Sequence, residues 1–99
     1  MKPLRFHPRV QRDLGEALDY YGSISELLAQ GFWDEIREGL KAIELQPEGH
    51  HFDASGLRRV NLARFPFNIL YVVKADRIRV QVIRHNSRRP GFGTKRKDR

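Results

Sequence analysis

The chain has 99 residues and no cysteine. This length suits one domain with one small core and excludes an enzyme with separate cofactor and substrate domains; the lack of cysteine excludes disulfides, thiol nucleophiles and thiolate metal sites. Residues 1–57 carry 6 basic and 10 acidic side chains, a net charge of −4, whereas residues 58–99 carry 13 basic and 2 acidic ones, a net charge of +11. A half this basic predicts a polyanion or an acidic protein surface as its counterpart.

The first half predicts one short strand and a helix. Residues 4–7 alternate apolar and polar side chains, which is typical of a strand with Leu4 and Phe6 on its buried face. Pro8 ends the strand and suits the first turn of a helix. Apolar side chains then recur at helical spacing, at Val10, Leu14, Ala17, Leu18 and Tyr21.

A second helix follows closely. Gly22 predicts the end of the first helix, and Ser23 with Glu26 forms a candidate capping box for the next one. Apolar residues continue at helical spacing until Pro47 closes the helix. Because the connection is so short, the two helices are expected to fold back as an antiparallel hairpin.

The second half predicts strands. Residues 57–63, 67–74 and 78–85 are rich in β-branched and aromatic side chains, and a tight turn over 75–77 joins the last two into an antiparallel meander. From about residue 90 the chain becomes a basic tail that we expect to be partly flexible. The prediction is a single α+β domain over residues 1–99 of order β–αα–βββ, with the helical hairpin packed on one face of a small antiparallel sheet.

Several classes of chemistry lack support in the sequence. It has no glycine-rich phosphate loop, no metal-ligand spacing and no serine or cysteine nucleophile with an evident base, so we expect no cofactor and no metal. The pair His50-His51 lies in a glycine-flanked connector and is interpreted as solvated loop. No apolar run approaches 18 residues and the chain opens Met1-Lys2-Pro3, so we expect a cytoplasmic protein with no membrane partner.

The arginines of the basic half are the candidate binding residues, because the planar guanidinium suits phosphates and carboxylates better than the point charge of lysine. His85 ends the last predicted strand among several of them, and the surrounding positive charge favours a neutral imidazole that could act as a base; the alternative is an ordinary surface histidine. The candidates for target or nucleic-acid binding are Arg58, Arg59, Arg64, Arg84, Arg88 and Arg89.

Two sets of motifs carry a resemblance to a known family. The run Arg64-Phe65-Pro66-Phe67-Asn68-Ile69-Leu70-Tyr71, followed by the strand over 78–85 and by Arg88-Arg89-Pro90, resembles the RelE/ParE family of bacterial toxins. The helical half is similar to the paired helices of that family at Asp19-Tyr20-Tyr21, Leu27-Leu28-Ala29 and Phe32-Trp33. The resemblance extends over nearly the whole chain.

The resemblance implies a function and a partner. Members of this family are toxins of type II toxin–antitoxin modules, which include plasmid stabilisation systems. Each is neutralised by a cognate antitoxin whose segment wraps the toxin and is commonly acidic where it binds. We therefore expect the helical hairpin or the adjacent sheet edge to present an apolar groove that an antitoxin helix or strand fills.

The family divides in mechanism. RelE-like members are ribosome-dependent mRNA endoribonucleases with a basic cluster on the sheet and near the C-terminus, whereas ParE-like members inhibit DNA gyrase and lack that cluster. The resemblance places Arg59 and Arg88 at basic positions of the cluster, but Asn61 and Asn68 stand where further cations are expected. The tail aromatic is Phe92, which has no hydroxyl to orient or transfer a proton.

The incomplete cation set favours a ParE-like inhibitor of DNA gyrase, which is not an enzyme. The alternative is a RelE-like ribosome-dependent endoribonuclease that acts on mRNA, with Arg59, Arg84, His85 and Arg88 as catalytic candidates. A second alternative is a non-toxic nucleic-acid-binding module, supported by the charge of +11 on residues 58–99.

Overall fold

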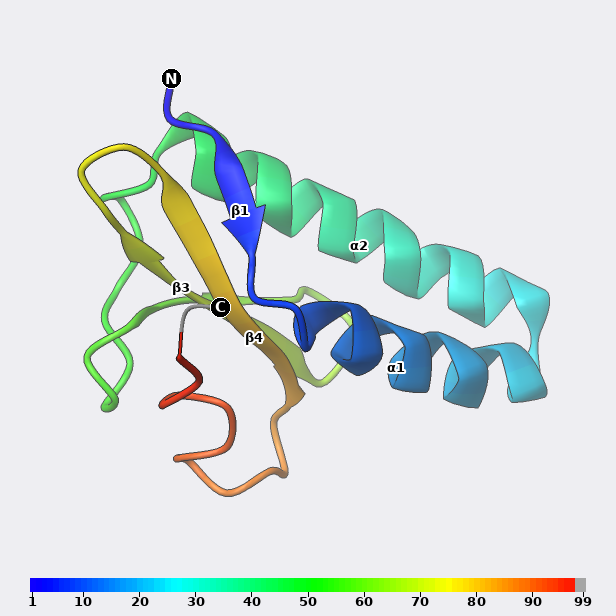
Figure 1. Ribbon diagram of the computed structural model, residues 1–99. Helices are drawn as coiled ribbons and strands as arrows, with labels where there is room; N and C mark the ends of the chain where they lie inside the picture. Colours follow the sequence, from blue (N-terminus) through cyan, green and yellow to red (C-terminus); the bar gives the residue numbers. More distant parts are fainter. Residues whose placement is uncertain (98–99) are drawn as a thin grey trace.

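The computed structural model describes residues 1–97 and has two layers, a pair of helices and a sheet (Figure 1). The elements are β1 (Leu4–Phe6), α1 (Val10–Ile24), α2 (Glu26–Leu45), β2 (Arg58–Asn61), β3 (Phe67–Val73) and β4 (Ile78–His85). The α+β order β–αα–βββ and the antiparallel helical hairpin are thus confirmed. The closed end of the hairpin extends past the sheet (Figure 1).

The sheet is mixed rather than wholly antiparallel. Its strand order is β1-β4-β3-β2, and β2, β3 and β4 form the predicted antiparallel meander. β1 instead pairs parallel to β4, with Leu4 opposite Ile78. The long helical connection between β1 and the meander permits this, since only hairpin-linked neighbours must be antiparallel. The prediction that Phe6 is buried is wrong: its side chain is 47% exposed, because β1 is a three-residue strand at the edge of the sheet.

The helix boundary differs from the predicted capping box. α1 continues through Gly22, and Ser25 caps α2: its Oγ accepts hydrogen bonds from the backbone N–H of Leu27 at 3.1 Å and of Leu28 at 3.4 Å. The Ser23 hydroxyl instead donates to the Tyr20 carbonyl of its own helix at 2.7 Å. Ser25 has the extended backbone that an N-cap requires, and a glycine near a helix end costs too little, about 1 kcal/mol, to force an earlier break.

The core lies between the hairpin and the sheet. Phe32, Ile36 and Ile43 project from α2 and are fully buried. Gly39 lets this helix approach closely, since a Cβ there would lie 3.0 Å from Ile69 Cδ1 on β3. The missing side chain at Gly39 thus permits the close contact between α2 and the sheet.

The opposite face of the sheet is also covered. Leu70 and Val82, which are register partners on β3 and β4, are fully buried, and Gly93 of the segment after β4 lies against Val82. Gln81 Nε2 donates to the carbonyls of Thr94 at 3.3 Å and Arg96 at 2.7 Å. Residues 91–97 of the basic tail therefore lie along β4, whereas residues 98 and 99 are outside the described range.

No helix within residues 1–97 is long and apolar enough to cross a membrane.

Candidate functional site

Arg84 is a buried cation, and each of its three side-chain nitrogens donates a hydrogen bond inside the protein. Its side chain is 5% exposed; Nε donates to Asn68 Oδ1 at 3.1 Å, Nη2 to Asp53 Oδ1 at 3.2 Å and Nη1 to the Pro90 carbonyl. Arg59 Nη1 donates to the same carboxylate oxygen at 3.1 Å. The structure thus joins two predicted site residues, but around a shared internal partner.

Asp53 is the anion that holds this cluster. Burial alone would raise its pKa, but hydrogen bonds from Ser55 and Arg59 and the charge of Arg84 outweigh burial and leave the pKa below its usual value. The carboxylate therefore stays ionised and pairs with two arginines of the basic half, balancing one of their two charges. Asp53 lies in the polar connector before β2, and the sequence gives no local signal for this role.

Asn61 and Asn68, where the resemblance led us to expect further cations, belong to the same arrangement. Asn68 accepts from Arg84, and Asn61 Oδ1 accepts from Arg59 Nε at 2.8 Å. A lysine or arginine at either position could only donate and would repel its neighbour. The two asparagines therefore act as acceptors in an internal hydrogen-bond network.

His85 faces the helix side of the sheet, where its ring packs edge-on against Phe67 with a centroid separation of 5.1 Å. Its Nδ1 accepts from the backbone N–H of Ser87 at 3.0 Å and lies 2.7 Å from the hydroxyl of the same residue. In a neutral imidazole this assigns the proton to Nε2. Neither ring nitrogen is then an open acceptor, which does not favour His85 as a general base.

Arg58 and Arg64 serve local structure at separate places. The Arg58 guanidinium stacks 4.1 Å from the centroid of the Phe52 ring and donates to the His50 carbonyl at 2.7 Å. Arg64 binds Glu35 of α2 through its backbone N–H at 3.0 Å and its Nε at 2.9 Å. Burial would raise the pKa of Glu35, but these hydrogen bonds outweigh it and lower that pKa.

Arg88 and Arg89 follow β4 and are both exposed. Arg88 lies over the Phe92 ring at 4.4 Å, whereas Arg89 forms no side-chain ion pair with any residue between 1 and 97. The six predicted binding arginines therefore do not form one surface.

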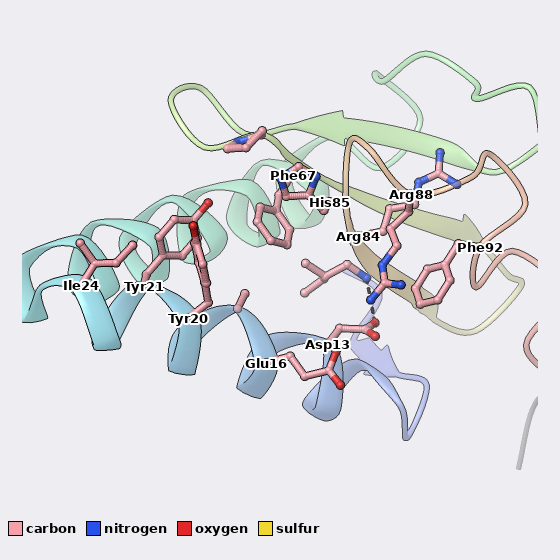
Figure 2. A pocket seen from close by; sticks show the side chains of 13 residues that line it. Asp13, Glu16, Tyr20, Tyr21, Ile24, Phe67, Arg84, His85, Arg88 and Phe92 are labelled. Atoms are coloured by element: carbon pink, nitrogen blue, oxygen red, sulfur yellow. Dashed lines mark hydrogen bonds between the residues drawn. The ribbon is translucent and has the colours of Figure 1, made fainter.

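A groove opens between α1 and the end of β4, with a volume of about 450 Å³ (Figure 2). Tyr20 and Ile24 of α1 project beside it and are 63% and 57% exposed. His85 and Arg88 line it at the β4 end. We call this the α1 groove; its other apolar lining comes from Ala17, Tyr21, Pro66, Phe67, Ile83 and Phe92.

An apolar groove beside the helical hairpin was expected, and Arg84, His85 and Arg88 of its lining were candidate residues, whereas Ile24 was not predicted. Tyr20 and Ile24 lie four residues apart, off the apolar stripe that packs α1 on the sheet. A second apolar pair at this spacing on one helix is the sequence signal that could have revealed them.

Comparisons with known proteins agree with this architecture. The family model described as the ParE toxin of the type II toxin–antitoxin system parDE matches residues 4–90. Among solved structures, a chain of the chromosomal ParDE toxin–antitoxin system from P. aeruginosa is similar, with a TM-score of 0.74 and 25% identity over 86% of this chain and 96% of that one. No curated protein matches the sequence. Because the family model covers most of its length, the chain belongs to the ParE toxin family and is the toxin component of a type II toxin–antitoxin system, the partner of a cognate antitoxin.

Proposed function

We propose that this toxin binds DNA gyrase and traps it on DNA, and does not cut mRNA. The observation that carries the proposal is that each side-chain nitrogen of the buried Arg84 donates to a group inside the protein, while Arg59 binds the same carboxylate of Asp53. Cleavage of RNA needs a base for the ribose 2′-hydroxyl, positive charge on the phosphate and an acid for the leaving 5′-oxygen. Two of the four nuclease candidates are thus engaged within the fold.

The other two nuclease candidates add little proton-transfer capacity. His85 has its Nδ1 occupied by Ser87, and Arg88 stays protonated and stacks on Phe92. The tail aromatic that could have carried a hydroxyl is a phenylalanine. A toxin that acts by binding a protein target needs none of these proton transfers.

The test is a supercoiling assay with purified DNA gyrase, run beside a cell-free bacterial translation reaction with the same toxin preparation. We expect inhibited supercoiling and trapped cleaved DNA at stoichiometric toxin, and intact mRNA in the translation reaction. Toxin preincubated with its antitoxin is the control and should leave gyrase active. Ribosome-dependent cuts in the mRNA, or normal supercoiling with a preparation that arrests growth, would overturn the proposal.

We further infer that an apolar segment of the antitoxin occupies the α1 groove. The two acidic side chains that line the groove are already paired, Asp13 with Arg96 and Glu16 with Arg12. Arg88 therefore remains as the charge at one end. The complementary ligand is a segment with apolar side chains along the groove and a carboxylate that reaches Arg88.

A pair of matched variants tests this docking site. Tyr20→Ala combined with Ile24→Asp removes the exposed apolar wall of the groove, and Leu45→Asp changes a comparably exposed residue, 61%, at the far end of α2. We expect the groove variant to bind antitoxin at least about tenfold more weakly in calorimetry. Co-expressed antitoxin should restore the growth of cells that express the Leu45 variant, but not of cells that express the groove variant. Equal affinities for both variants would place the antitoxin elsewhere.

A further inference from the structure

A second hollow, of about 790 Å³, lies where the start of α1 meets the segment after β4. We call it the basic hollow. Arg9 and Arg12 line it from the α1 side, and Arg89, Lys95 and Lys97 line it from the C-terminal segment. All five side chains belong to exposed residues. The first turn of α1, whose N-cap residue makes no side-chain cap hydrogen bond, adds partial positive charge at the rim.

The acidic residues of the basic hollow are neutralised within the fold. Asp13 is bound by both terminal nitrogens of Arg96, at 2.7 and 2.9 Å, and Glu16 pairs with Arg12 at 3.3 Å. Arg9, Arg89 and Lys95 form no ion pair with any residue between 1 and 97. The hollow therefore presents uncompensated positive charge to solvent.

The side chains that line the basic hollow indicate which kind of partner it binds. Protein interfaces are anchored by apolar and aromatic side chains that bury in the partner. The aromatic residue here is Phe92, and the guanidinium carbons of Arg88 and Arg96 lie 4.4 and 5.6 Å from its ring centroid. Its faces are thus shared with cations. Long exposed cations around a concave surface suit a row of phosphates instead.

We propose that the basic hollow binds the phosphate backbone of duplex DNA without sequence preference. Duplex binding does not depend on the identity of the toxin's target. The role that we assign to this DNA binding is to hold the toxin on the DNA that gyrase has bound, and this role rests on the proposed function. This surface is distinct from the predicted arginines on β2 and β4, two of which meet at Asp53.

The experiment measures binding of the purified chain to a labelled duplex of about 30 bp by fluorescence anisotropy over a series of salt concentrations. The test variant is Arg9→Ser, Arg89→Ser and Lys95→Ser together. We expect its affinity for the duplex to fall at least about tenfold at low salt. The plot of log K against log salt should also become shallower, with the magnitude of its slope smaller by about 2 to 3, since each phosphate contact contributes about 0.9.

The matched control removes the same charge elsewhere, with Arg5→Ser, Arg37→Ser and Lys41→Ser on exposed positions of β1 and α2. We expect the control to lose less than about threefold in affinity. Equal losses in both variants, or no duplex binding by the wild-type chain, would overturn the proposal. A competition experiment provides a further test. If poly-glutamate displaces the labelled duplex as effectively as unlabelled duplex does at the same charge concentration, the ligand is an acidic protein and the proposal fails.

A gyrase assay with the same proteins separates the two proposals. If the wild-type toxin leaves supercoiling unchanged while duplex binding still depends on the hollow, the gyrase function fails and the DNA site stands. If gyrase is inhibited equally by wild type and test variant, the hollow plays no part in trapping the enzyme.

Discussion

Two groups of cations in this toxin differ in what they can reach. Around Asp53, Arg84 and Arg59 direct their donors into the protein, and one of them is almost fully buried. At the basic hollow, Arg9, Arg89 and Lys95 face solvent with no ion-pair partner within residues 1–97. The difference teaches that the net charge of a segment predicts the sign of its partner but not which residues remain to bind it.

Desolvation explains the difference. A cation taken out of water must find an anion and hydrogen-bond acceptors, or its burial is strongly unfavourable. An exposed cation keeps its water and needs no internal partner. Removing an anion should therefore be damaging in the first group, and removing a cation should be harmless to stability in the second.

The largest effect is expected for Asp53→Ala, which leaves Arg84 buried without its counterion. We expect the free energy of unfolding to fall by about 3 to 5 kcal/mol, measured by urea denaturation. Asp76→Ala, which removes an exposed partner of Arg77, is the control and should lose less than about 1 kcal/mol. Similar losses in the two variants would contradict the distinction between the two cation groups.

A smaller effect is expected for Gly93→Ala, since the tail covers Arg84 and also lines the basic hollow. Gly93 has φ +75°, and a Cβ there would lie 2.5 Å from Val82 Cγ2. We expect a loss of about 1 to 3 kcal/mol in thermal unfolding and faster proteolysis of the tail. Gly91→Ala has open space around its Cβ position and should show neither change. Unaltered proteolysis of the Gly93 variant would mean that the tail is not held by this contact.

A pH effect is expected where the tail meets β1. His7 Nδ1 accepts from the Arg9 N–H at 3.1 Å, and Nε2 donates to the Lys97 carbonyl at 2.8 Å. Burial lowers the pKa of His7 from 6.5; the Lys97 carbonyl opposes this, and the charges of Arg79, Arg96 and Arg9 add to it.

Because the pKa of His7 is lower in the folded state, the unfolded chain binds more protons below pH 6.5. The stabilisation is present above pH 6.5 and is lost as the pH falls through the folded pKa. We expect thermal unfolding temperatures to drop between about pH 7.5 and pH 5, and His7→Gln, which keeps a donor but does not titrate, to flatten that drop. An unchanged slope in the variant would assign the pH dependence to other groups.

The smallest effect on stability is expected for Arg89→Ser. Because Arg89 is exposed and unpaired within residues 1–97, the free energy of unfolding should stay within about 0.5 kcal/mol of the wild type in urea denaturation. The same variant should weaken duplex binding measurably. A large loss of stability would show that Arg89 has a structural role, and would contradict the distinction between buried and exposed cations.

The elements with local signals were predictable. Residues 78–85 form β4 with the predicted bounds, and the apolar spacing of both helices gave their type and order. The register shift at Leu70 and Tyr71 breaks the alternation within β4, so Val82 does not share the core face of Ile78 and Val80. The cap at Ser25 was missed because Ser23 with Glu26 offered a competing capping pattern two residues earlier. Extended backbone at the hairpin turn, which the sequence pattern does not show, decided between them.

The interactions at the site were not predictable because they join distant parts of the chain. Asp53 reaches Arg84 over 31 positions and Asp13 reaches Arg96 over 83, so no spacing rule links the partners. The same holds for the parallel pairing of β1 with β4. The sequence named the arginines but could not say which of them an acidic residue elsewhere would neutralise.

The contact between residues 7–13 and residues 96–97 has a consequence for how the toxin folds. His7 and Asp13 at the beginning hold the backbone of Lys97 and the side chain of Arg96 at the end. Closing so long a loop comes late in folding, since its entropy must be lost before the contact forms. The basic hollow, which Lys95 and Lys97 line, therefore takes its full shape only after this contact has closed, so it is one of the last surfaces to form as the toxin folds.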